Sequence, residues 1–135
     1  MTKKFSKIDI FTHVLTERYR KTLYRKCQRS LYTEGLEAHH NAIPALFDIE
    51  LRLRIMNRYE GLSQVLSITS PPVEMVASPG DAIELSQMAN DEMAELVAKH
   101  PDHFAAAVAC LPMNDVDAAL KEVERAIETL NMKGV

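Results

Sequence analysis

A histidine stands at the end of a short apolar segment near the N-terminus. The segment from Lys7 to His13 reads KIDIFTH and has β-branched residues on either side of Asp9, which favours a β-strand. A buried strand with a histidine at its carboxyl end is how barrel enzymes present a metal ligand. Phe11 lies two residues before His13 and on the same side of a strand, where a second ligand is expected. His13 is therefore a candidate metal ligand without its usual neighbour.

Two further pairs of histidines are weaker candidates. His39 and His40 are adjacent, and neighbouring side chains of an extended segment point to opposite sides, so they rarely share an ion. We predict a solvated loop over residues 35–41, with the approach of one of these histidines to a substrate as the alternative. His100 and His103 lie at the end of a predicted helix, where a cationic imidazole is favourable. We do not expect this second pair to act in catalysis.

The chain alternates between strand-like and helix-like patterns. Short apolar runs bounded by Pro or Gly predict strands, whereas apolar residues spaced three and four apart predict helices. This alternation builds a parallel sheet with right-handed crossovers, so the expected fold class is α/β. The predicted strands cover residues 7–13, 64–69 and 104–111, with the start of a fourth at 132–135, and the predicted helices begin at Thr16, Pro44, Asp81 and Asn114.

Residues that follow the second and third predicted strands belong to the same site as His13 if the sheet is parallel. The carboxyl ends of parallel strands then meet at one edge, which is the catalytic face of a barrel. Thr69 and Ser70 end the second strand, and the segment from Cys110 to Pro112 ends the third. The Ser70 hydroxyl is the candidate for binding a substrate carboxylate, with ordinary capping of the strand end as the alternative.

A family resemblance rests on the order and spacing of five segments. They are KIDIFTHVL at 7–15, RLRIMNRYEGLSQVLS at 52–67, SPP at 70–72, ANDEMAELVAKHPDHFAA at 89–106 and LPMNDVDAAL at 111–120. With these segments the chain resembles the amidohydrolase-related family, which is typified by aminocarboxymuconate semialdehyde decarboxylase and the dihydroxybenzoate decarboxylases. The resemblance runs the length of the chain.

The resemblance implies a (β/α)8 TIM barrel with a divalent metal at the carboxyl ends of its strands, acting on small carboxylated, often aromatic, substrates. Zinc is the expected ion, with manganese or magnesium as alternatives. In this family the first strand typically ends Asp-x-His-x-His, or carries a Glu in place of the first His, whereas here it reads Asp9-Ile10-Phe11-Thr12-His13. Only His13 matches a ligand position, because a phenyl ring offers a metal no lone pair.

The 135 residues of the chain are fewer than such a barrel needs, since eight strands typically require about 250 residues. We predict a single domain over residues 1–135 that forms the N-terminal part of a barrel, with about three βα units and the start of a fourth strand. The family's other metal ligands, a His and a late Asp, would lie beyond Val135. We expect a fragment, a split gene product or a chain completed by oligomerisation, because a partial barrel leaves sheet edges unpaired.

Composition and charge narrow the class of protein. A hydrophobic content of 47% indicates a globular domain, and no apolar run approaches the ~20 residues of a membrane-spanning helix, so a cytoplasmic location is expected. Cys27 and Cys110 stand in different settings and are expected to be reduced thiols.

Residues 1–30 hold nine Lys and Arg against two acidic residues. The basic stretch from Arg18 to Arg29 is expected to be a solvated helix or an arm that docks on an acidic neighbour, with nucleic-acid binding as a weaker alternative.

Two functions from different classes follow from these observations. The leading hypothesis is the N-terminal part of a metal-dependent decarboxylase or hydrolase, in which His13 is one ligand of a metal that acts as a Lewis acid or activates water. The rival is a non-catalytic partial barrel that serves assembly or interaction and has lost its metal site at Phe11. The expected partners are a small carboxylate substrate and either the remaining barrel segment or a second copy of the chain.

Overall fold

A three-stranded parallel sheet lies at the centre of the molecule. The structure is a computed structural model that describes residues 7–28 and 33–135. The strands are β1 (Lys7–Val14), β2 (Leu62–Ile68) and β3 (Phe104–Ala107), hydrogen-bonded in the order β1-β2-β3. The predicted α/β class and the parallel pairing are therefore confirmed, and the three carboxyl ends lie at one edge of the sheet.

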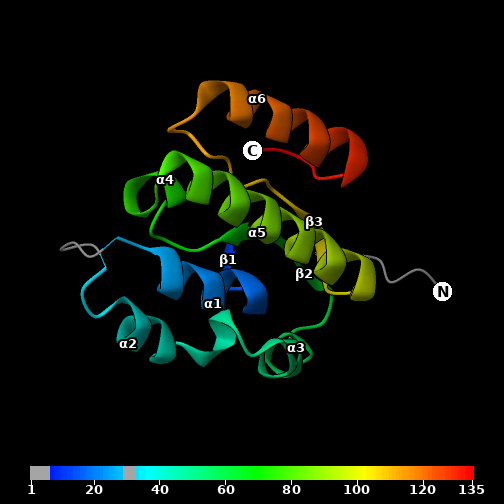
Figure 1. Cartoon of the computed structure of the whole chain (residues 1–135). Coiled ribbons are helices and arrows are strands. Elements are labelled where there is room, and N and C mark those ends of the chain that lie inside the picture. The colour runs from blue at the N-terminus through cyan, green and yellow to red at the C-terminus, as the bar shows by residue number, and fades with distance from the viewer. Residues whose placement is uncertain (1–6, 29–32) are drawn as a thin grey trace.

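Helices connect the strands and pack against the sheet (Figure 1). They are α1 (Glu17–Lys26), α2 (Leu36–Asn41), a 3-10 turn (Pro44–Leu46), α3 (Ile49–Met56), α4 (Val73–Val76), α5 (Pro79–Lys99), α6 (Val116–Glu124) and a π-helical turn (Arg125–Thr129). Helix α5 packs on β2 and β3, with α1 on one side of it and α6 on the other. Among the described residues, no helix is long and apolar enough to cross a membrane.

Side-chain caps decide where three of the helices begin. The capping oxygen accepts a backbone N–H three residues further on, and so satisfies a donor that has no partner within the helix. The predicted helix starts at Pro44, Asp81 and Asn114 were displaced because other side chains provide the caps, and Pro44 opens only the 3-10 turn. The capping residues are Asp48 for α3, Ser78 for α5 and Asp115 for α6.

Residues 35–41 were predicted as a solvated loop, and this prediction was wrong. Gly35 adopts a left-handed φ of +71°, which glycine tolerates without strain, and α2 begins at the next residue. The side chain of His39 is exposed on this helix, whereas His40 is only 1% exposed. Burial of one histidine of the pair follows from packing that a single segment does not reveal.

Strand β3 is shorter than predicted. It ends at Ala107 rather than Leu111, because the chain beyond it turns towards α5. There the Cys110 N–H donates to Oδ1 of Asn90 at 2.7 Å, and the Cys110 carbonyl accepts from Nδ2 of the same side chain at 2.9 Å. An asparagine side chain thus replaces the neighbouring strand as hydrogen-bond partner.

The predicted fourth strand at 132–135 does not join the sheet as a regular strand. Two backbone hydrogen bonds tie this segment to the end of β3, from Lys133 N–H to the Ala107 carbonyl at 3.0 Å and from Ala109 N–H to the Gly134 carbonyl at 2.9 Å. The segment therefore runs beside β3 at the position where a fourth strand would begin.

The core is apolar and lies between the sheet and its helices. On α1, the side chains of Tyr19 and Leu23 are buried as their fourfold spacing predicts. Leu31, which continues this spacing, lies outside the described residues. Two clusters make up the core, one around Leu15, Tyr19, Val73 and Leu85 and the other around Val14, Leu66, Met93 and Phe104.

Two surfaces keep large apolar side chains exposed. Helix α6 buries Ala119 and Glu122, whereas Val116 and Leu120, which are four residues apart and therefore on one face of the helix, are 70% and 65% exposed. Strand β1 likewise exposes Ile8, Ile10 and Phe11. Monomeric proteins rarely leave such surfaces uncovered.

The basic helix α1 docks on the acidic helix α5, as expected from the charge pattern. Arg18 pairs with Glu92 and Glu95 on α5. The carboxylate of Glu92 is buried and also accepts the backbone N–H groups of Arg18 and Tyr19 at 3.0 and 2.9 Å, so it caps the start of α1. At the other end, Lys26 pairs with Asp81 and Glu84.

Candidate functional site

The carboxyl edge of the sheet carries a depression of about 440 Å³. The predicted substrate-binding residue Ser70 lines it, together with Ser67 at the end of β2. His13 is not part of the lining, but its imidazole contacts Ser67. The remaining lining residues are mostly apolar and include Pro71, Pro72, Val108, Leu111 and Met113. Parallel pairing therefore brings the candidate metal ligand and the candidate carboxylate-binding hydroxyl to one edge, as predicted.

The imidazole of His13 is held by the neighbouring strand. Its Nδ1 lies 2.9 Å from Oγ of Ser67, which is its direct partner in the parallel register of β1 and β2. The Ser67 hydroxyl donates to the Thr12 carbonyl at 2.7 Å. The backbone carbonyl of His13 accepts a hydrogen bond from the buried Arg52 of α3 at 2.6 Å. Both the side chain and the backbone of His13 are thus fixed.

A bulge in β1 separates this end of the strand from its beginning. The register shifts between Asp9 and Thr12, so that Ile10 and Phe11 together face a single residue of β2. The carboxylate of Asp9 accepts the Phe11 N–H at 3.1 Å and so has a structural role within the bulge. Bulges often occur beside active sites, because the extra residue re-aims the side chains around it.

The side chain of Phe11 lies beside His13 at the carboxyl end of β1. It is 81% exposed, and its ring meets that of His13 edge-on with the centroids 5.0 Å apart. Phe11 and His13 therefore lie on one side of β1, as the spacing predicts. Within residues 7–28 and 33–135 there is no group of three His, Cys, Asp or Glu that could hold a metal ion. The described residues fit the role of a single ligand and do not supply a complete set.

His40 fixes the loop that carries Ser70. Its Nε2 donates to the Ser70 carbonyl at 3.1 Å, and its Nδ1 accepts from the Tyr24 hydroxyl at 2.8 Å. Burial lowers the pKa of His40 below its ordinary value, because the low-dielectric surroundings disfavour the cation. The imidazole is therefore neutral at pH 7. It holds the backbone of Ser70, which lines the depression, in place.

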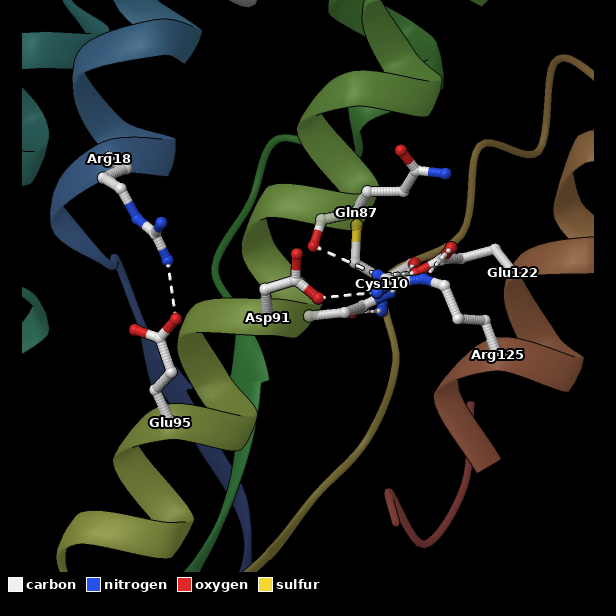
Figure 2. Close-up of polar contacts among 8 residues, drawn as sticks. Arg18, Gln87, Asp91, Glu95, Cys110, Glu122 and Arg125 are labelled. Carbon is white, nitrogen blue, oxygen red and sulfur yellow. Dashed lines mark hydrogen bonds and ion pairs between the residues drawn. The ribbon is translucent and has the colours of Figure 1, made fainter. Parts of the chain in front are cut away.

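Behind the depression, a buried polar network fixes the end of β3. Asn90 Nδ2 donates to the Glu122 carboxylate at 2.7 Å, and Glu122 pairs with Arg125 at 2.8 Å. Figure 2 shows Arg125 reaching from the end of α6 to Asp91 on α5. Burial raises the pKa of the Cys110 thiol to about 11, so this thiol is protonated and not a ready nucleophile. Cys27 and Cys110 are both free cysteines, as predicted.

Sequence reasoning missed the supporting residues of the site. Ser67 lies inside a predicted strand, and only the register with β1 reveals its contact with His13. Asn90 carried a weak signal, since it directly follows Ala89 of the apolar stripe of α5 and is itself buried.

His103 contacts Asn57 at 2.8 Å and directly precedes β3, so it lies at the end opposite the depression, where no catalytic role was expected.

Comparison with known proteins identifies the family. The amidohydrolase family model matches residues 8–135. The chain therefore belongs to the amidohydrolase family, and the resemblance drawn from the five sequence segments is confirmed.

Individual relatives are decarboxylases of aromatic acids. Gamma-resorcylate decarboxylase of Rhizobium sp. (strain MTP-10005) is 39% identical over 90 residues, which make up 66% of this chain and 27% of the relative. The solved structure of 5-carboxyvanillate decarboxylase from Sphingomonas paucimobilis matches 98% of this chain and 42% of its own, with a TM-score of 0.79 and 25% identity.

A third relative was solved with a metal. Dihydroxybenzoic acid decarboxylase from Polaromonas sp. JS666, with bound manganese and the inhibitor 2-nitroresorcinol, matches 97% of this chain and 37% of its own, with a TM-score of 0.75 and 30% identity. The chain thus spans well under half the length of the relatives it matches.

Proposed function

We propose that this chain forms the N-terminal part of a metal-dependent decarboxylase that acts on small aromatic carboxylates. The observation that carries the proposal is the geometry at the carboxyl edge, where His13 is oriented by Ser67 beside a depression that Ser70 lines. The family match and the decarboxylase relatives support the choice of reaction. Hydrolysis is the alternative reaction within the same site.

In this proposal the residues of this chain bind the metal ion and the substrate and orient them. His13 supplies one imidazole ligand, and a divalent ion held there supplies Lewis-acid chemistry towards a carboxylate or a water. The Ser70 hydroxyl donates a hydrogen bond to the substrate carboxylate, while His40 holds the Ser70 backbone in place. Apolar lining residues such as Pro71 and Leu111 accommodate the aromatic ring and exclude water from it.

The rest of the site comes from further strands of the barrel. Residues 1–135 are one domain in this proposal, and the exposed apolar side chains of β1 and α6 are the surfaces on which the remaining barrel segment, or a second copy of the chain, packs. The remaining ligands, for zinc or for the manganese seen in one relative, are expected from that segment.

A second function is favoured by one observation. Phe11 stands where a ligand is expected and is almost fully exposed, which suits a partial barrel that has lost its metal and serves assembly. The nucleic-acid alternative receives less support, because Arg18 and Lys26 of the basic helix are already paired with carboxylates of α5.

Metal analysis separates the two functions. The chain, assembled with the segment or second copy that supplies the remaining ligands, is loaded with Zn²⁺ or Mn²⁺, desalted and analysed for bound metal, as wild type and as His13→Ala. We expect bound metal that His13→Ala abolishes and that His39→Ala, on the exposed neighbour of His40, leaves unchanged. Release of CO₂ from 2,6-dihydroxybenzoate by the assembled barrel tests the reaction. An assembled barrel that binds neither metal above the level of His13→Ala contradicts the enzymatic proposal.

A further inference from the structure

A single hydroxyl group stands between the candidate ligand and the backbone of its own strand. Oγ of Ser67 lies 2.9 Å from Nδ1 of His13 and 2.7 Å from the carbonyl oxygen of Thr12. Both distances are those of ordinary hydrogen bonds. Ser67 belongs to β2 and the other two residues to β1, so the contact exists only because the strands pair in this register.

The number of protons available fixes which group donates in each of the two hydrogen bonds of Ser67. A carbonyl oxygen can only accept, so the one proton of the Ser67 hydroxyl goes to Thr12. The hydroxyl then has only lone pairs to offer His13, and Nδ1 must carry the proton of that second bond. In a neutral imidazole the other nitrogen, Nε2, is consequently left with a free lone pair. This is the form in which a histidine ligates a metal through Nε2.

Other contacts restrict the same residue. The guanidinium of Arg52 is buried and donates to the His13 carbonyl at 2.6 Å. The ring of Phe11 meets the imidazole edge-on at an interplanar angle of 73°. Strand pairing and the arginine hold the backbone of His13, while Phe11 packs against one edge of its imidazole and Ser67 hydrogen-bonds to it.

We propose that Ser67 is a positioning residue that holds His13 as the Nδ1–H tautomer and so presents Nε2 to a divalent cation. Hydrogen bonds from a metal-binding histidine to a second group commonly set its tautomer and ring orientation. Here a serine of the adjacent strand has that role. The inference rests on the proposed function for the cation and on the strand geometry for the tautomer.

Nitrogen NMR of the imidazoles tests the tautomer without any metal or activity. Long-range ¹H–¹⁵N spectra of the labelled, metal-free chain are recorded well above the ordinary pKa of histidine, and His13→Gln assigns the His13 signals. We expect the Nδ1–H pattern for His13 in the wild type. Ser67→Ala should convert it to the Nε2–H form or a mixture, whereas Ser67→Thr, which keeps a hydroxyl, should preserve it.

A matched control comes from the same strand. Ser63 is buried at the other end of β2, and its hydroxyl donates to the His103 carbonyl at 2.9 Å. Ser63→Ala therefore removes a similar hydrogen bond but should leave the His13 pattern unchanged. A wild type with the Nε2–H pattern, or a Ser67→Ala variant that is folded and has an unchanged pattern, would overturn the inference.

Zn²⁺ titration by calorimetry, carried out on the chain assembled with the segment or second copy that supplies the other ligands, separates this inference from the proposed function. We expect Ser67→Ala to weaken Zn²⁺ binding by about tenfold or more, and Ser67→Thr to restore it. If the wild type binds no Zn²⁺ but shows the serine-dependent tautomer, the enzymatic proposal fails and the positioning by Ser67 is supported. If Zn²⁺ binds equally well to the wild type and Ser67→Ala, the positioning role fails and the proposed function stands.

Discussion

The helix-covered side of the sheet and its carboxyl edge treat polar groups differently. Between α5 and α6, Asn90 and Glu122 are 0% and 3% exposed and hydrogen-bond to each other, while Asn90 also binds the backbone of Cys110 and Glu122 pairs with Arg125. At the carboxyl edge, the polar Ser70 is exposed, and so is the apolar ring of Phe11, which is 81% exposed. Removing a buried partner leaves a desolvated group without compensation, whereas an exposed group can turn to water.

This difference means that the residues that stabilise the fold and the residues of the candidate site lie in different regions of the molecule. The buried network joins α5, α6 and the end of β3, so it fixes where the edge lies. The edge residues themselves contribute little burial, which leaves their chemistry open to change at small cost in stability. A barrel shows the same division, with chemistry at the carboxyl ends of its strands. Four substitutions test the comparison, from the largest expected loss of stability to the smallest.

Glu122→Ala should cause the largest loss of stability. It removes the partner of the buried Asn90 amide and of Arg125, and we expect the free energy of unfolding to fall by about 3 kcal/mol. Urea denaturation followed by circular dichroism measures this. Glu124→Ala, on the exposed side of the same helix, should change the free energy by less than about 0.5 kcal/mol. Equal effects of the two variants would contradict the importance of the network.

His40→Leu should have an intermediate effect that depends on pH. The variant loses the hydrogen bonds to Tyr24 and Ser70, so we expect a loss of about 1 to 2 kcal/mol at neutral pH. The depressed pKa of His40 means that the unfolded chain binds a proton there more readily than the folded chain. Its contribution to stability is therefore present above about pH 6.5 and is lost as the pH falls through the folded pKa.

Unfolding curves between about pH 7.5 and 5.5, spanning the ordinary histidine pKa, measure this dependence. The wild type should lose stability over this range more steeply than His40→Leu. His39→Leu, on the exposed neighbour, should keep the wild-type slope. A wild type and a His40→Leu variant with parallel curves would show that His40 does not titrate in this way.

Arg18→Ala should have a small effect. The side chain is 58% exposed and pairs with the exposed Glu95, and exposed ion pairs contribute about 0.5 kcal/mol. Its other partner, the buried Glu92, keeps two backbone N–H donors in the variant. Raising the salt concentration should reduce the difference between wild type and variant further, because exposed charges are screened. A loss that is large and independent of salt would place this contact with the buried network.

Phe11→His should change stability least and function most. Because the ring is largely exposed, little buried area is lost, while the substitution restores a His-x-His pattern with His13. We expect Zn²⁺ to bind tenfold more tightly or better, which corresponds to about 1.4 kcal/mol. Phe11→Leu, which adds no ligand, is the control for calorimetric titration. Unchanged Zn²⁺ affinity in Phe11→His would show that residue 11 does not face the metal position.

Local patterns in the chain were enough to predict much of the fold. The three strands, their parallel order and the apolar face of α1 follow from periodicity and from the breaks at proline and glycine. The helix starts were less accurate, because Asp48, Ser78 and Asp115 compete with other capping candidates a few residues away. The exposure of Val116 and Leu120 on α6 was not decided by the local pattern, since periodicity shows that a helix has an apolar face but not what covers it.

By itself the sequence determined the family, the strand that carries His13 and the absence of a ligand at residue 11, because these depend on residue type and on order along the chain. Only the tertiary structure decided the partners: Ser67 for His13, His40 for Ser70, and Asn90 for Cys110. These partners are between 20 and 54 residues apart in the sequence. Strand register and helix packing bring them within hydrogen-bond distance, and no local pattern encodes that register.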